Sequence, residues 1–191
     1  MKKQERIFRE ILENFKKEKT LFQNKISKKC DVSIGLVNKT VKKLEEQGCV
    51  QIKTRGFSVI NAKKILLYWA SLRNLNKDII YETFCDKPIE KIENMMPSCL
   101  FTAYSGFKYK FDNIPSDYSE IFIYADKDEI RKRFSKNKKK PNILVLKSDK
   151  HLEKFKQIPV SQLYVDLWNI NTWYAQEFLK SLEEKINGIL E

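Results

Sequence analysis

The sequence predicts an α+β fold in two parts: three helices and a β-hairpin over residues 1–62, then a small mixed α+β domain over residues 63–191 that ends in a long helix. Two observations support this prediction. In the first part, apolar residues recur at helical spacing in three segments and then alternate with polar residues on either side of an Arg-Gly turn. In the second part, short apolar runs of strand length alternate with amphipathic segments, which is typical of a sheet covered by helices.

The first two predicted helices span residues 4–17 and 22–30. The apolar face of the first consists of Ile7, Phe8, Ile11, Leu12 and Phe15. The second is shorter and carries Ile26 on its apolar side. Helical spacing of this kind predicts two helices that pack through one face each.

Residues 33–47 are expected to form a third helix. Ser33 can cap it, because a Ser oxygen accepts from the free N–H groups of a first helical turn, and Gly48 ends it. Its apolar face comprises Val37, Val41 and Leu44. Its opposite face is polar and basic, with Asn38, Lys39, Lys42 and Lys43.

Residues 50–60 are expected to form a hairpin. Before the turn, Val50, Ile52 and Thr54 alternate with Gln51, Lys53 and Arg55. The turn is made by Arg55 and Gly56, and Phe57 begins the returning strand.

The run SIGLVNKTVKKLEEQG, followed by CVQIKTRGFSV, resembles the winged-helix transcriptional regulators of bacteria and archaea, and the resemblance covers residues 1–62. In that family the third helix lies in the major groove and the hairpin, called the wing, follows the phosphate backbone. The resemblance therefore implies a recognition helix at 33–47 and a wing at 50–60. It places these residues against DNA: Ser33, Leu36, Asn38, Lys39, Lys42 and Lys43 on the helix, and Lys53 and Arg55 on the wing.

The residue types and the charge suit this role independently. Asn can bond bidentately to adenine and Lys can reach the acceptors of guanine, while other Lys and Arg side chains suit phosphate. Of the net charge of +12, residues 1–62 carry +8, with 15 Lys and Arg against 7 Asp and Glu; the remaining 129 residues have 22 against 18. The alternative is a solvated lysine face on a protein-interaction module, but lysines on both helix and wing favour DNA.

The second part is expected to begin with a helix over residues 63–76 that bridges the two domains and carries Trp69 as a core or interface anchor. The further predicted helices are 86–96, 126–134, 160–170 and 173–190, and the predicted strands are 121–124 and 142–147. Residues 100–107 are apolar and fit either type of element. The last helix carries Phe178, Leu182, Ile186 and Ile189, which fit either a homodimer seam or the last core helix.

Residues 131–140 form a second basic segment, with seven bases and no acid: Arg131, Lys132, Arg133, Lys136, Lys138, Lys139 and Lys140. This pattern fits a second nucleic-acid contact. It fits equally a solvated helix end that runs into a loop before Pro141.

Residues 159–180, PVSQLYVDLWNINTWYAQEFLK, resemble the carboxy-terminal segment of AbiEi-like proteins, the antitoxin and transcriptional-regulator family of abortive-infection toxin–antitoxin systems. The segments LFTAYSG and IFIYA occur in the same order as the corresponding helix and strand of that family, so the resemblance extends over most of the chain. It implies a winged helix that binds the promoter of its own operon and a second domain that supports neutralisation of a nucleotidyltransferase-like toxin. The alternative is that the segment SQLYVDLW is simply an amphipathic core helix.

Catalytic motifs are not found. His151 is the only histidine and therefore the only possible base of a nucleophilic triad. The five glycines form neither GxxxxGK nor GxGxxG. Asp126 and Asp128 follow a predicted strand as metal-binding carboxylates do in nucleotidyltransferases, but Ser105-Gly106 is no phosphate-binding loop, so we expect both to cap a helix. We expect no enzymatic activity.

Cys30, Cys49, Cys85 and Cys99 are widely spaced, which argues against a zinc site or a disulfide framework. The amino-terminal segment lacks the apolar core of a signal peptide, and no apolar run reaches membrane-spanning length. We therefore expect a cytoplasmic protein without metal or cofactor.

The expected function is that of a transcriptional regulator that binds double-stranded DNA. Its second domain is expected to dimerise, to sense, or to dock a partner such as a toxin-like protein. Two alternatives stay open: a non-specific architectural protein that binds nucleic acid, whose affinity would depend steeply on salt, and a winged helix used for protein contact.

Overall fold

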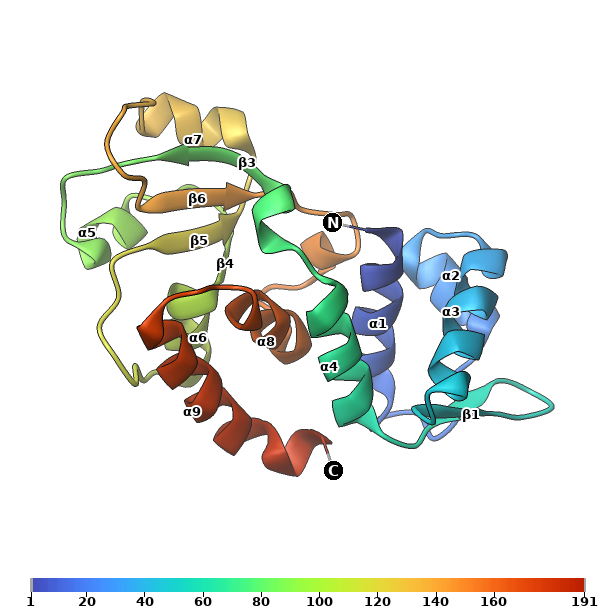
Figure 1. The fold of residues 1–191 in the computed structure, drawn as a ribbon. Coiled ribbons are helices and arrows are strands. Elements are labelled where there is room, and N and C mark those ends of the chain that lie inside the picture. Colours follow the sequence, from blue (N-terminus) through green and yellow to red (C-terminus); the bar gives the residue numbers. More distant parts are fainter. Residues whose placement is uncertain (1, 191) are drawn as a thin grey trace.

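The computed structural model describes residues 2–190, and it describes side chains as far as residue 186. The fold is α+β, as the sequence predicts, with one two-stranded and one four-stranded sheet in this part of the chain. Figure 1 shows the larger sheet and its helices on the left, a central layer of helices, and the amino-terminal helices with the small sheet on the right.

Three helices open the chain: α1 (Lys3–Asn14), α2 (Gln23–Cys30) and α3 (Ile34–Glu46). They pack through the apolar faces that their periodicity predicts, and Ile11, Ile26 and Val41 are at most 2% exposed. Asp31 caps α2 in the left-handed conformation, with φ 52°, and so redirects the chain into α3.

The small sheet is a hairpin of β1 (Val50–Ile52) and β2 (Phe57–Val59), in which Ile52 lies opposite Phe57. The connecting loop therefore covers residues 53–56, and Thr54 lies in this loop rather than in the predicted strand. Leu21, between α1 and α2, pairs with Phe57 through N–H···O bonds of 2.8 and 2.9 Å. Gly56 has φ +86°, and a Cβ there would lie 2.3 Å from the Leu21 carbonyl oxygen, so this loop requires glycine.

Helix α4 (Ala62–Leu72) connects the two halves. It contacts α1 on one side and α8 (Val160–Trp168) on the other. Trp69 is buried, and its Nε1 donates to Glu5 of α1 at 3.1 Å. One hydrophobic cluster contains residues of α1, α3, α4 and α8, so the two predicted domains share a core.

The larger sheet has the strand order β3-β6-β5-β4, with β3 (Ile79–Thr83), β4 (Leu100–Thr102), β5 (Ile121–Tyr124) and β6 (Ile143–Leu146). The two central strands, β5 and β6, run parallel, and the outer strands pair antiparallel to them. These central strands correspond to the apolar segments 121–124 and 142–147, which the sequence predicts to be strands. The segment 100–107 consists of both element types, since β4 leads directly into helix α6 (Ala103–Phe111).

The two faces of this sheet have separate coverings. Phe122, Tyr124 and Leu146 face the large cluster shared with α6, α8 and α9 (Trp173–Leu190). The other face packs on α5 (Ile89–Asn94) and α7 (Lys127–Arg133) through Ile92 and Ile130. Single 3-10 turns, η1 (Leu75–Asp78) and η2 (Leu152–Lys154), complete the described elements. The predicted helix over 86–96 is shorter than expected.

The last helix, α9, is a core helix. Phe178, Leu182 and Ile186 are at most 1% exposed within the single chain, so the dimer-seam interpretation of these residues is wrong. Ile189, the fourth residue of that interpretation, lies outside the described side chains. Among the described residues, no helix combines the length and the apolar character needed to cross a membrane.

Candidate nucleic-acid interface

The turn between α2 and α3 is held by short-range hydrogen bonds. The Ser27 hydroxyl donates to the Val32 carbonyl at 2.6 Å, and the Val32 N–H donates to the Ser27 carbonyl at 3.1 Å. Ser33 caps α3 as predicted, because its Oγ accepts from the Leu36 N–H at 3.3 Å. These bonds fix the direction in which α3 leaves the turn.

Helix α3 has one buried and one exposed face. Val37, Val41 and Leu44 are fully buried. At 3.6 residues per turn, Lys39 and Lys42 lie on the opposite side of the helix, and both are exposed. The structure therefore brings these two predicted contact residues to the centre of the exposed face.

The other predicted residues of α3 lie on its flanks. Asn38 is exposed and shares a flank with Glu45, seven residues later, whose Oε1 accepts from the N–H of Ile52 in β1 at 2.8 Å. Asn38 therefore lies on the flank that carries the hairpin. Leu36 and Lys43 share the other flank, and Leu36 is half-buried against the core, which leaves only part of it available to a ligand.

Lys43 interacts with the helix that connects the two halves. Its Nζ lies 5.7 Å from the ring centre of Tyr68 on α4, and a hydrogen bond to the Tyr68 hydroxyl raises the pKa of Lys43. Among the α3 residues predicted to contact DNA, Lys43 therefore already interacts with another side chain of the protein.

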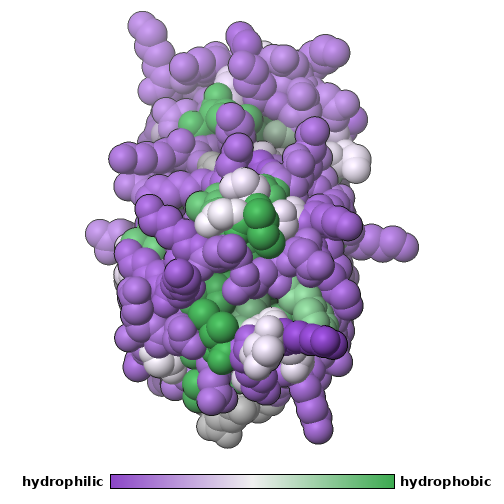
Figure 2. All heavy atoms as spheres, turned by 90° about the vertical axis from the view of Figure 1, so that its right-hand side faces the viewer, coloured by the Kyte–Doolittle hydropathy of each residue, from purple (hydrophilic) through white to green (hydrophobic). Residues whose placement is uncertain are grey.

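The hairpin loop supplies a second exposed basic group beside α3. Lys53 and Arg55 are both exposed in the 53–56 loop, where the Lys53 N–H donates to the Gly56 carbonyl at 3.0 Å. The bond between Glu45 and Ile52 ties the base of the hairpin to α3. Figure 2 shows this side of the molecule: most of its surface is hydrophilic, with hydrophobic areas in the upper part, at the middle and in the lower part.

The second basic segment, residues 131–140, does not join this surface. Figure 1 shows α7 and its following loop at the end of the molecule opposite to the hairpin. Some of its bases have local partners: Arg133 donates to the Met95 carbonyl at 2.9 Å, and Lys139 lies 3.9 Å from the Asp86 carboxylate. The structure therefore contains two separate basic surfaces.

The sequence did not indicate a buried ionic network that joins the helices of the interface to the larger sheet. Arg9 of α1 is fully buried and donates to both oxygens of Asp149, at 3.1 and 3.2 Å. It also donates to Gln162 of α8 at 3.0 and 2.8 Å. Because these partners are 140 and 153 positions away from Arg9, no local pattern could have revealed them.

The described cysteines and carboxylates do not gather into a candidate metal centre: no group of three or more His, Cys, Asp or Glu residues has a suitable arrangement there. Burial raises the pKa of the Cys30 and Cys99 thiols to about 12, so both are protonated near neutral pH. Asp126 caps α7, as the sequence predicts, since it accepts from the N–H groups of Asp128 and Glu129. The same prediction is wrong for Asp128, which lies within the first turn of α7.

Comparisons of this chain with protein-family models, with curated proteins and with solved structures gave no significant match.

Proposed function

We propose that the protein is a DNA-binding transcriptional regulator, in which α1 to α3 and the hairpin form a winged helix-turn-helix. Helix α3 enters the major groove and the hairpin serves as the wing on the phosphate backbone. The observation that carries this proposal is the exposed pair Lys39 and Lys42 on α3 beside the basic hairpin loop, with the hairpin tied to α3 through Glu45.

Each exposed side chain has a role that suits its chemistry. Lys39 and Lys42 reach phosphate oxygens or the O6 and N7 atoms of guanine. Asn38 reads adenine, because its amide can donate and accept at the same base edge. Lys53 and Arg55 contact phosphates and so contribute affinity without sequence preference.

The remainder of the chain is proposed to regulate or dock rather than to catalyse, within a cytoplasmic protein. The suggested similarity to AbiEi-like antitoxins makes an autoregulator with a toxin-like partner the most specific version of this proposal. Exposed Trp173 and Trp168, 73% and 43% exposed near the junction of α8 and α9, are available for such a contact.

The test is selection of sheared genomic DNA from the source organism by the purified full-length protein at near-physiological salt, followed by sequencing. Enrichment of a few sites, above all one upstream of the protein's own gene, is the expected result. The variant Lys39→Ala/Lys42→Ala should lose this enrichment. The control Lys132→Ala/Lys138→Ala removes the same charge from the far end of the molecule and should retain it.

A non-specific architectural role is the second candidate, and the net charge of +12 together with two separate basic surfaces favours it. Such a protein would recover genomic fragments uniformly. Failure of the wild-type protein to recover any DNA would overturn both candidates and direct attention to protein or RNA partners.

A further inference from the structure

We propose that the protein binds a nucleoside phosphate in a pocket at the larger sheet, and that this pocket communicates with the helix-turn-helix through residues 147–156. The proposal of a ligand site depends only on the residues and the shape of the pocket. The communication with DNA rests on the proposed function.

The pocket forms where the two parallel strands end. Asp126 follows β5 and Lys147 follows β6, and both line a cavity of about 720 Å³. In open sheets with parallel strands, ligands bind in the crevice outside the carboxyl ends of those strands. The volume is within the range of cavities that hold small organic ligands, roughly 300–1,000 Å³.

Its charged side chains favour an anion. Lys127, Lys147 and Lys156 line the cavity, and within the described residues none of them forms an ion pair. Two carboxylates also line it: Glu153, and Asp126, whose Oδ1 accepts the two N–H groups at the start of α7, so three lysines face two acids. Lysine ammonium groups without a carboxylate partner are suited to phosphate oxygens.

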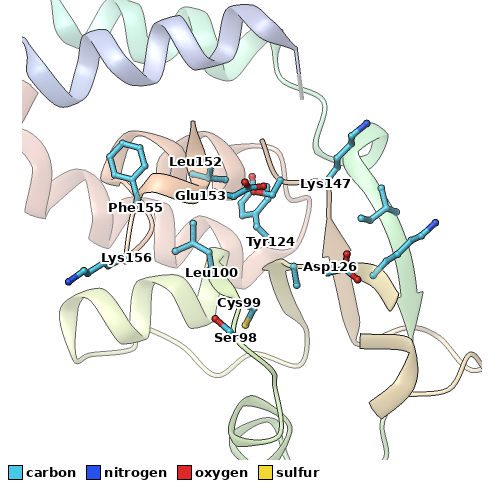
Figure 3. A pocket seen from close by; sticks show the side chains of 14 residues that line it. Ser98, Cys99, Leu100, Tyr124, Asp126, Lys147, Leu152, Glu153, Phe155 and Lys156 are labelled. Atoms are coloured by element: carbon cyan, nitrogen blue, oxygen red, sulfur yellow. The ribbon is translucent and has the colours of Figure 1, made fainter. Parts of the chain in front are cut away.

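The remaining side chains suit a nucleoside. Figure 3 shows Lys147 and Asp126 at one end of the pocket, Phe155 and Lys156 at the other, and Tyr124 between them. The Lys147 and Lys156 side chains extend outward at these two ends. A phosphate at the Lys147 end leaves the half-buried Phe155 ring as an apolar surface for the base. Glu153, exposed at the cavity, can accept from ribose hydroxyls or an exocyclic amine.

The same segment that forms one side of the pocket also holds α1 and α2. Asp149 accepts from Arg9 of α1 at 3.1 Å, and His151 Nε2 lies 2.9 Å from the Glu10 carboxylate of α1. Lys154 donates to the Lys29 carbonyl of α2 at 2.7 Å. Ligand contacts at Lys147, Glu153 and Phe155 therefore act on residues 147–156, which also position the helix-turn-helix.

The floor of the pocket provides a second connection. The Tyr124 hydroxyl accepts from Arg73 at 2.9 Å and from Gln162 at 3.0 Å, and it donates to Asp166 at 2.6 Å. Gln162 in turn accepts from Arg9. A continuous chain of hydrogen bonds thus links the pocket to α1.

Isothermal titration calorimetry of the full-length protein tests the site, with AMP, ADP, ATP and GTP as probes at up to about 1 mM. At least one should bind, and inorganic phosphate and the free nucleosides should bind at least about tenfold more weakly. The absence of binding by all four nucleotides would overturn the proposal. Equal binding of inorganic phosphate would overturn the assignment of a nucleoside.

Matched variants locate the binding. Lys147→Ala and Lys127→Ala should each weaken the nucleotide by about tenfold. The controls Lys150→Ala, on the same segment, and Lys132→Ala, on the same helix, lie outside the pocket lining and should bind as the wild type does. Equal effects in variants and controls would place the nucleotide elsewhere.

The communication is tested by the DNA affinity with and without saturating nucleotide. A change of about threefold or more in the wild type, absent in Lys147→Ala, is the expected result. If a nucleotide binds but the DNA affinity does not change, the proposed communication is wrong and the proposed ligand site is retained. Because calorimetry needs no DNA, failure of the DNA-binding proposal would not conceal the outcome for the pocket.

Discussion

The Arg73 guanidinium donates to the Asp166 carboxylate at 2.7 Å, and both side chains are completely inaccessible to solvent. Arg73 follows α4 and Asp166 lies in α8, so this pair joins the bridging helix to the helix that covers the larger sheet. Burial by itself lowers the pKa of Arg73, but Asp166, Tyr124 and Glu5 more than compensate and raise it. The Arg73 charge is therefore retained in the core because it has several partners.

Removal of one member of this pair should be costly. Asp166→Ala removes the carboxylate that accepts from Arg73 Nε and leaves the buried Thr102 and Tyr124 hydroxyls without this acceptor. It is expected to lower the free energy of unfolding by about 3–5 kcal/mol in urea titrations. Asp117→Ala, which removes an exposed carboxylate, is the control and should change it by less than about 0.5 kcal/mol. Similar small losses in both variants would contradict a structural role for the network.

Acid should weaken the contact between α1 and residues 147–156. Burial raises the pKa of Asp149, but the charge and hydrogen bonds of Arg9 outweigh it, so the pKa is below its ordinary value. A depressed carboxylate pKa stabilises the fold above the pKa of the unfolded chain, and this stabilisation is lost as pH falls through the folded value. We therefore expect the difference in unfolding free energy between wild type and Asp149→Asn to shrink below about pH 4. A difference independent of pH would exclude this linkage.

The hairpin loop should be sensitive to a single methyl group. Gly56→Ala adds a Cβ at φ +86° and 2.3 Å from the Leu21 carbonyl oxygen. It is expected to destabilise the protein by roughly 1–3 kcal/mol and to weaken DNA binding by displacing Lys53 and Arg55. Gly35→Ala is the stability control, since Gly35 has open space around it and lies within α3. It should stabilise by about 0.5–1 kcal/mol. Thermal unfolding of both variants measures these two opposite changes in stability.

The sequence-based predictions were most accurate where local periodicity determines structure. The exposed positions of Lys39 and Lys42 follow directly from the buried spacing of Val37, Val41 and Leu44. Edge strand β3 was missed because Ile79–Thr83 contains polar residues and pairs with β6, 60 to 67 positions away. The pairing of Arg9 with Asp149 and the pocket at Lys147 depend on the same kind of long-range contact.

Asn38 should discriminate between sequences rather than supply affinity. Asn38→Ala is expected to reduce the preference for the selected site over random DNA by about 1–3 kcal/mol, the value of a lost bidentate base contact. Competition binding with both duplexes measures this preference. Equal weakening on the two DNAs would remove Asn38 as a base reader.

The most direct test of the proposed DNA-binding interface is the salt dependence of binding to a genomic site selected by the protein, measured by fluorescence anisotropy. Lys42→Ala and Arg55→Ala should each weaken binding and reduce the slope of log K against log salt by about 0.9, because each removes one phosphate contact. Lys138→Ala, at the far end of the molecule, should leave both affinity and slope unchanged. Equal slopes for the wild type and all three variants would contradict the assignment of α3 and the hairpin as the DNA-binding surface.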